Sequence, residues 1–311
     1  MVWSCLVSIL PGMAQTEKLT DYVNPFVGTD GYGNVYPGAQ IPFGGIQISP
    51  DTDSRFYDAA SGYKYNHLTL MGFSLTHLSG TGIPDLGDFL FIPGTGEMKL
   101  EPGTHEDPDQ GYRSRYSHDK EWASPNYYAV ELADYGVKAE MTSGVRSGMF
   151  RFTYPESDNA FIMIDMNHTL WQSCEWSNLR MINDSTITGY KLVKGWGPER
   201  HVYFTATFSK KLTGLRFVQD KKPVIYNTSR FCSSYEAWGK NLMACISFDT
   251  KAGEEVTVKT AISAVSTDGA RNNMKELDGL TFNELRAKGE ALWEKELGKY
   301  TLTADRKTKE T

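Results

Sequence analysis

Two pairs of closely spaced carboxylates are the first candidates for chemistry in this sequence: Asp51 with Asp53, and Asp85 with Asp88. Two carboxyl groups that face one substrate can act as general acid and general base. Aspartates only two or three residues apart in glycine-rich turns, however, more often accept hydrogen bonds from turn backbone. We therefore interpret both pairs as structural, with a direct chemical role as the alternative.

Both pairs lie within stretches that are rich in glycine. The first stretch, NPFVGTDGYGNVYPGAQIPFGGIQISPDTD, spans residues 24–53, and the second, THLSGTGIPDLGDF, spans residues 76–89. Glycine permits positive φ and close approach of backbone to a ligand, while proline fixes the neighbouring turns. Rigid loops of this kind can line a pocket, and the polar side chains of the second stretch suit hydroxyl recognition. The alternative is that both stretches are only tight turns between strands.

The composition and the remaining motifs exclude several function classes. The 311 residues carry 32 basic and 38 acidic side chains, a net charge of -6 without long runs of one sign, so no electrostatic footprint for nucleic acid is present. The six histidines form no H-E-x-x-H motif, and DPDQG lacks the remaining ligands of a calcium loop. We expect no metal to be bound by this chain alone. The sequence also contains no phosphate-binding loop and no G-x-S-x-G nucleophile motif.

Strands dominate the predicted secondary structure. The segments HVYFTATF (201–208) and EVTVKTAI (255–262) alternate apolar with polar side chains, which is typical of strands with one buried face. Four further segments of similar length are bounded by turn residues: MFRFTY, AFIMIDM, STITGYKLV and LMACISFD. Short strands from about Tyr127 to Val265 without intervening helices predict a mainly β fold, a large antiparallel β-sandwich.

Helical spacing replaces strand spacing after Ser266. Thr281 followed by Glu284 predicts a capping box, and apolar residues then recur at helical spacing along FNELRAKGEALWEKEL (282–297). A shorter helix is predicted over GARNNMKEL (269–277), and the polar TLTADRKTKET (301–311) has no core of its own. The apolar side of the long helix must therefore pack on the sandwich or on something outside this sequence.

The N-terminal residues 1–15 resemble an export signal. VWSCLVSIL supplies a short apolar region, and cleavage is expected after Ala14 or Gln15. A basic leading region is missing, so the signal is either truncated or only an apolar fringe. The stretch is too short to span a membrane, and no other candidate span follows.

Among the other cysteines, Cys232 and Cys245 have hairpin-like spacing for one disulfide, and buried free thiols are the alternative.

Four segments together resemble the N-terminal half of glycoside hydrolase family 92: YVNPFVGTDGYGNVYPGAQIPFGGIQISPDTD, GFSLTHLSGTGIPDLGDFLFIP, ISAVSTDGARNNMKEL and FNELRAKGEALWEKELGKY. Members of that family are inverting, calcium-dependent exo-α-mannosidases common in gut Bacteroidota. The resemblance implies a galactose-mutarotase-like supersandwich over residues 20–265 and a helical linker over 266–300. It further implies that the tail, 301–311, leads to an (α/α)6 barrel that this sequence does not contain.

The resemblance also implies which domain of the full-length enzyme carries the catalytic residues and which helps to bind the substrate. It places the catalytic acid, the base and most calcium ligands of the full-length enzyme in the barrel, and therefore no catalytic residue in this chain. It implies that the glycine-rich loops help to bind a terminal α-mannoside, through Gly28, Thr29, Asp30, Phe43, His77, Ser79, Gly80, Thr81, Ile83, Asp85 and Asp88. Ile83 and Pro84 stand where some α-1,2-specific members have an aromatic residue, so the linkage preference stays open.

Two hypotheses of function follow. In the first, the chain is part of an exported glycan-degrading α-mannosidase, in the periplasm or on the surface of a Gram-negative bacterium, and is inactive unless the barrel is supplied in cis or in trans. In the second, it is a stand-alone carbohydrate-binding or interaction module without hydrolase activity.

Overall fold

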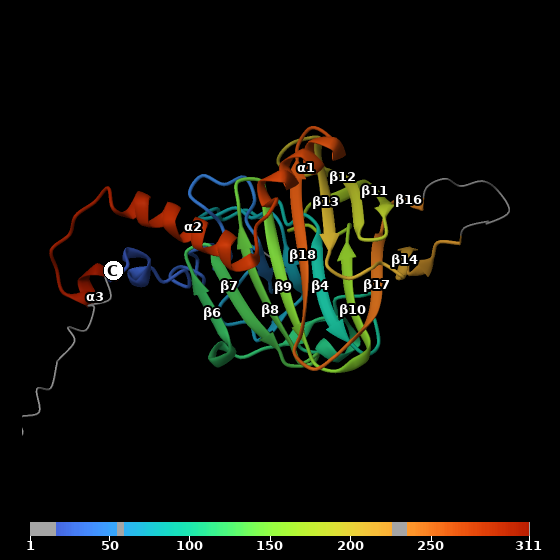
Figure 1. Cartoon of the computed structure of the whole chain (residues 1–311), viewed down its shortest axis with the longest axis horizontal. Coiled ribbons are helices and arrows are strands. Elements are labelled where there is room, and N and C mark those ends of the chain that lie inside the picture. Colours follow the sequence, from blue (N-terminus) through green and yellow to red (C-terminus); the bar gives the residue numbers. More distant parts are fainter. Residues whose placement is uncertain (1–16, 55–58, 226–234, 311) are drawn as a thin grey trace, which may run out of the picture.

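The computed structural model describes residues 17–54, 59–225 and 235–310. In these ranges two antiparallel sheets lie face to face, which confirms the predicted mainly β sandwich (Figure 1). In spatial order, the seven-stranded sheet contains β1 (Ser49–Asp51), β3 (Gly72–Ser74), β4 (Leu90–Thr95), β10 (Ser157–Asp165), β17 (Leu242–Thr250), β14 (Gly214–Gln219) and β15 (Lys222–Pro223). The nine-stranded sheet contains β16 (Glu236–Gly239), β11 (Ser173–Asn183), β12 (Thr186–Lys194), β13 (Arg200–Phe208), β18 (Glu254–Ser263), β9 (Ser147–Tyr154), β8 (Val137–Ser143), β7 (Tyr127–Leu132) and β6 (Glu121–Ser124). A small third sheet pairs β2 (Thr69–Leu70) with β5 (Ser114–Arg115).

The alternation seen in the sequence sets which side chains enter the space between the sheets. Val202, Phe204, Ala206 and Phe208 of β13 are all buried, as are Val256, Val258 and Thr260 of β18. Successive side chains of a strand point to opposite faces, so one face of each sheet becomes the core. Aromatic rings from both sheets meet there, with the Phe91 and Phe150 ring centroids 4.9 Å apart.

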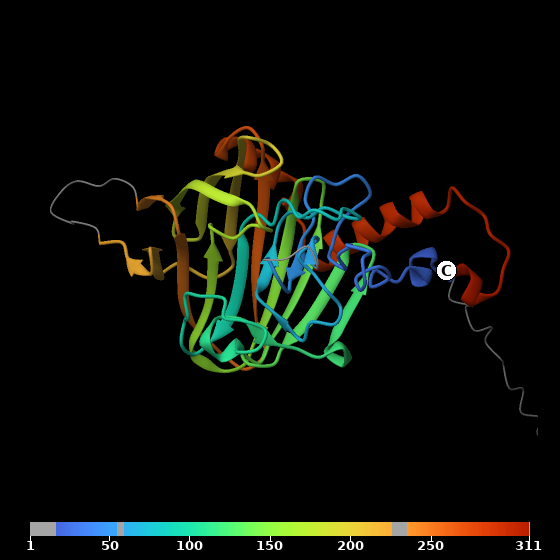
Figure 2. The same ribbon diagram turned by 180° about the vertical axis from the view of Figure 1, so that it is seen from behind.

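The outer face of the seven-stranded sheet is covered by chain rather than by helices. A second apolar cluster there joins Leu90, Phe161, Met163 and Met243 to Tyr112. The covering segment includes the short 3-10 helix η3 (Pro108–Gln110), and η4 (His118–Lys120) follows it before β6. Figure 2 shows this side of the molecule, with the light blue and teal segments in front of the sheet.

All of the α-helices in the described ranges follow the last strand, together with one 3-10 helix. They are α1 (Thr267–Met274), the 3-10 helix η5 (Lys275–Leu277), α2 (Phe282–Leu297) and α3 (Arg306–Lys309). The predicted capping box is confirmed, because Glu284 N donates to Thr281 Oγ1 at 3.3 Å and Thr281 N donates to Glu284 Oε2 at 2.8 Å. Phe282 and Leu285 are buried against the outer face of the nine-stranded sheet. None of the helices in the described ranges has the length and apolarity needed to cross a membrane.

The second half of α2 passes beyond the sheets and holds the N-terminal segment (Figure 1). Glu294 Oε1 accepts a hydrogen bond of 2.7 Å from Thr20 N, at the start of the 3-10 helix η1 (Leu19–Tyr22). Trp293 Nε1 donates to Gln40 O at 2.7 Å. The helix therefore contacts the segment that precedes the first glycine-rich stretch and, at Gln40, the middle of the stretch itself, while Leu292 remains 43% exposed.

Candidate functional site

The two glycine-rich stretches are hydrogen-bonded to each other and to the segment between them. Gly80 N donates to Asn34 O at 2.7 Å, and Gln47 N donates to Leu75 O at 2.9 Å. The Ser61 hydroxyl also donates to Asn34 O. These bonds tie residues from the first stretch, the second stretch and the intervening segment into one loop cluster beside the sandwich.

The predicted site residues divide by exposure. Phe43 is 92% exposed and Ile83 is 48% exposed. Asp30, Ser79 and Gly80 are also exposed, Gly28 is exposed at positive φ, and Thr81 is half-buried. By contrast, four of the predicted residues are buried, namely Thr29, His77, Asp85 and Asp88. The exposed group can meet a ligand, whereas the buried group supports the loops.

Asp51 is the centre of one buried polar network. Its Oδ1 lies 2.7 Å from His77 Nε2, and its Oδ2 lies 2.7 Å from His168 Nε2. His77 Nδ1 lies 2.8 Å from Gln47 O, so both nitrogens of this ring face acceptors. Burial opposes the charged form of Asp51, but the two histidines outweigh it and hold the pKa of the carboxyl well below its usual range. A Cβ at Gly62 would lie 2.1 Å from Asp51 Oδ1, so this position requires glycine.

Asp85 and Asp88 differ in what they bind. Asp85 accepts backbone hydrogen bonds from Leu86 N at 2.6 Å and Trp196 N at 3.2 Å, as predicted for a turn aspartate. Asp88 instead lies 2.6 Å from Arg200 Nη1 and 3.2 Å from Lys191 Nζ. Burial opposes ionisation of Asp88, but these two cations prevail and lower the pKa of its carboxyl. The prediction of turn-backbone partners is therefore wrong for Asp88, and likewise for Asp51.

Several bulky residues of this region adopt left-handed backbone conformations. The φ angles are +60° at Phe43, +74° at Leu86, +58° at Phe89 and +80° at Trp171. For residues with large side chains such angles store roughly 1–3 kcal/mol each, and they concentrate at functional sites. The strain falls on the two glycine-rich stretches and on the segment that follows β10.

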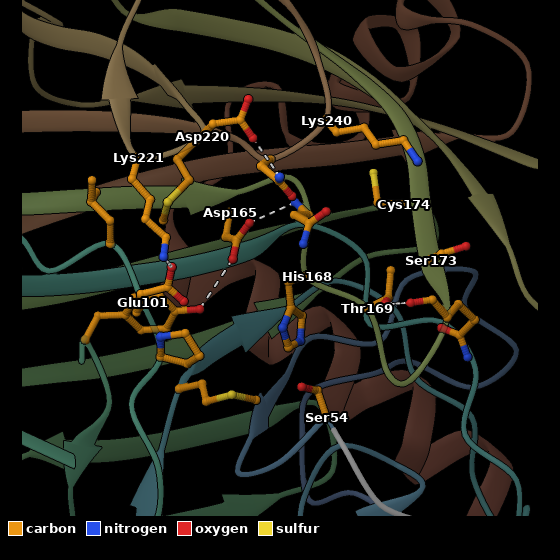
Figure 3. Close-up of a pocket in the computed structure, with 18 of the residues that line it drawn as sticks. Ser54, Glu101, Asp165, His168, Thr169, Ser173, Cys174, Asp220, Lys221 and Lys240 are labelled. Atoms are coloured by element: carbon orange, nitrogen blue, oxygen red, sulfur yellow. Dashed lines mark hydrogen bonds and ion pairs between the residues drawn. The ribbon is translucent and has the colours of Figure 1, made fainter. Parts of the chain in front are cut away.

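A cavity of about 1010 Å³ opens beside the loop cluster, on the outer side of the seven-stranded sheet. Figure 3 shows Asp165 and His168 in the middle of its lining, with Lys221 and Lys240 toward opposite edges. Its apolar lining includes Met71, Leu100, Pro102 and Met243, and its polar lining includes Asp165, Asn167, Gln172, Asp220, Lys221 and Lys240. Burial raises the pKa of the Cys174 thiol, which makes this lining residue a poor nucleophile.

None of the predicted site residues lines this cavity. The segment NHTLWQSC, residues 167–174, supplies much of it. A signal was available in the sequence: a strand ending in Asp165 is followed by a polar turn that carries a tryptophan. The predicted disulfide partner Cys232 lies outside the described residues, as do residues 1–15, and Cys174 and Cys245 are buried free thiols.

No cluster of three or more His, Cys, Asp or Glu side chains suited to a metal ion occurs within residues 17–54, 59–225 and 235–310. The carboxylates nearest the loops are already bound to histidines, cations or backbone N–H groups. Calcium requires six to eight oxygen ligands, so these residues do not fit a calcium site.

The structure is a large β-sandwich domain with a helical extension and a cluster of glycine-rich loops beside the sheets. The model of the glycosyl hydrolase family 92 N-terminal domain matches residues 22–263, and the chain therefore belongs to this family. An uncharacterized secreted glycosidase of Arthroderma benhamiae is 26% identical over 90% of this chain. The chain spans 38% of that relative's length.

Two solved structures share the fold. The gh92 family glycosyl hydrolase ccman5 is 26% identical, with a TM-score of 0.78, over 92% of this chain and 38% of its own. The family GH92 inverting mannosidase BT2199 of Bacteroides thetaiotaomicron VPI-5482 is 24% identical, with a TM-score of 0.79, over 96% of this chain and 38% of its own. This chain thus corresponds to the N-terminal domain of larger glycosidases.

Proposed function

We propose that this chain is the glycan-facing N-terminal domain of an exported α-mannosidase that removes terminal α-mannosides from glycans. The observation that supports it most is the loop cluster, which presents the exposed Phe43 in a strained backbone conformation and lies in the part of the chain that matches the family model. The resemblance of residues 1–15 to an export signal and the secreted relative support export, to the periplasm or the surface of a Gram-negative bacterium.

The chemistry of inversion needs two separated carboxyl groups. One protonates the leaving oxygen, and the other activates a water on the opposite face of the sugar, at a separation of about 6.5–9.5 Å. Asp51 and Asp88 are fully buried, and Asp85 is engaged by backbone N–H groups. We therefore assign the acid and the base to an (α/α)6 barrel, together with the calcium ligands, and assign no catalytic residue to this chain.

The loops supply binding in this proposal. The Phe43 ring offers an apolar face, and the backbone and hydroxyl groups near Ser79 and Gly80 offer hydrogen bonds to sugar hydroxyls. Binding energy realised away from the scissile bond can orient the substrate for the barrel's carboxylates. The loops would then affect turnover without taking part in proton transfer.

The test joins this chain to a family 92 barrel, in cis or in trans, and measures mannose release. Phe43→Gly removes the ring and also relieves the positive φ, so we expect about a tenfold lower kcat/KM, equal to about 1.4 kcal/mol, without a lower melting temperature. Trp122→Ala, a change of an exposed aromatic residue on β6, is the control and should leave turnover unchanged. Equal kcat/KM for Phe43→Gly and the unchanged protein would contradict the assignment of this loop to the site.

A further inference from the structure

We propose that the 1010 Å³ cavity is a second glycan-binding site, for a neutral oligosaccharide, separate from the loop cluster. Its residues come from the outer side of the seven-stranded sheet and from the turns that precede β11, β15 and β17. The argument rests on the lining itself. Only the choice of an α-mannoside as first probe rests on the proposed function.

Trp171 is the first observation. Its backbone has a φ of +80° and its side chain is 54% exposed at the cavity. The residues before and after Trp171 are hydrogen-bonded to the second glycine-rich stretch. Leu170 N donates to Leu86 O at 2.9 Å, and Gln172 Nε2 donates to Pro84 O at 2.8 Å. The fold therefore holds a bulky residue in a costly conformation that presents its indole to solvent. Aromatic faces are platforms for the apolar faces of sugar rings.

Two acceptors are the second observation. Gln172 Oε1 is buried and has no hydrogen-bond partner within the described residues, although this residue lines the cavity. A buried polar atom left unpaired is costly and calls for a donor. Asp165, at the end of β10, accepts from Asn167 N at 2.8 Å and from Tyr112 Oη at 3.3 Å. A sugar hydroxyl is a donor that suits the Asp165 carboxylate directly, whereas a donor can reach the buried Gln172 Oε1 only if the side chain shifts.

The charges favour a neutral ligand over an anion. Lys221 is paired with Glu101 at 2.5 Å, and Lys240 is paired with Glu175 at 3.1 Å. Asp165 and Asp220 add negative charge to the same lining. A phosphate or a sulfated glycan would meet carboxylates and neutralised lysines, whereas uncharged hydroxyls can bind all of these groups. The volume lies at the upper end for ligand pockets, which suits several sugar rings.

The experiment measures binding of the 311-residue chain by calorimetry, with an α-mannotetraose as probe and cellotetraose as a second neutral probe. Trp171→Gly removes the indole and relieves the backbone, so we expect about a tenfold loss of affinity, equal to about 1.4 kcal/mol, together with an unchanged or higher melting temperature. Asp165→Asn, which keeps the shape of the side chain, should also weaken binding. Trp122→Ala, which changes an exposed residue of β6 away from both sites, should retain it.

The outcomes separate the two sites. Loss of binding in Phe43→Gly with retention in Trp171→Gly and Asp165→Asn would overturn the second site while leaving the proposed function intact. Binding of cellotetraose alone, lost in Trp171→Gly, would support the second site and count against a mannoside ligand. Absence of binding by either probe up to about 10 mM, weaker than the millimolar range of weak specific complexes, would overturn the inference.

Discussion

Replacing Asp88 with asparagine should lower the free energy of unfolding by about 3–5 kcal/mol, as expected when one partner of a buried ion pair is removed. The carboxylate lies between Lys191 Nζ at 3.2 Å and Arg200 Nη1 at 2.6 Å, and the Lys191 side chain is 0% exposed. Asparagine keeps the shape and an acceptor for the Thr76 hydroxyl, which donates to Asp88 Oδ2 at 2.7 Å. It leaves the buried ammonium without a counter-charge, however, and this term outweighs the single hydrogen bond that can be kept.

Urea denaturation followed by tryptophan fluorescence gives the free energy of unfolding. Asp85→Asn is the matched control, because Asp85 is also buried and its carboxylate accepts hydrogen bonds from the backbone groups Leu86 N and Trp196 N, with no ion pair to it within the described residues. Its loss should be about 1–2 kcal/mol. A cost for Asp88→Asn no greater than that for Asp85→Asn would refute the claim that Asp88 acts as the counter-ion of Lys191 and Arg200.

Two further predictions concern stability in acid and the packing of α2. Burial opposes ionisation of Asp51 and Asp88, but the histidines beside Asp51 and the two cations beside Asp88 lower the carboxyl pKa values. The two carboxylates therefore stabilise the fold above the unfolded pKa of about 3.9. This stabilisation is lost as the pH falls through the lower pKa values of the folded state. Urea titrations at several pH values should show that the free energy of unfolding falls below about pH 4, and that it falls less steeply in Asp88→Asn. The same pH dependence in both proteins would contradict the role of Asp88 in acid sensitivity. Gly289→Ala should lower the melting temperature measured by circular dichroism, because the new Cβ would lie 1.7 Å from Asn126 Nδ2. The cost of overpacking, about 1–3 kcal/mol, exceeds the gain in helix propensity of about 1 kcal/mol. A higher melting temperature would show that α2 does not pack closely at this residue.

Local patterns in the sequence were sufficient for the strands and the long helix. The period-two burial of β13 and β18 and the capping box of α2 depend on residues only a few positions apart. Partners distant in the chain were not accessible in this way. His168 is 117 residues from Asp51, and Arg200 is 112 residues from Asp88, so spacing alone suggested turn-backbone partners for both aspartates.

The cavity escaped prediction for the same reason. Its wall joins Tyr112, Trp171 and Asn241, which come from three connections that only the sheet order brings together. The positive φ of Trp171 is set by the bonds of its neighbours to the second glycine-rich stretch and has no signature in the local sequence. The loop cluster, in contrast, was predictable, because dense glycine and proline mark unusual backbone directly.

The central claim is that this chain binds glycan but carries no catalytic machinery, and mannose release tests it most directly. The purified 311-residue chain is incubated with an α-mannobiose series, with and without excess calcium, and then again after a separately expressed family 92 barrel is added. We predict no release by the chain alone under either condition, and release once the barrel is present, because inverting hydrolysis requires a positioned acid and base. Turnover by the repurified chain alone that Asp85→Asn abolishes, with the fold of the variant retained, would contradict the claim.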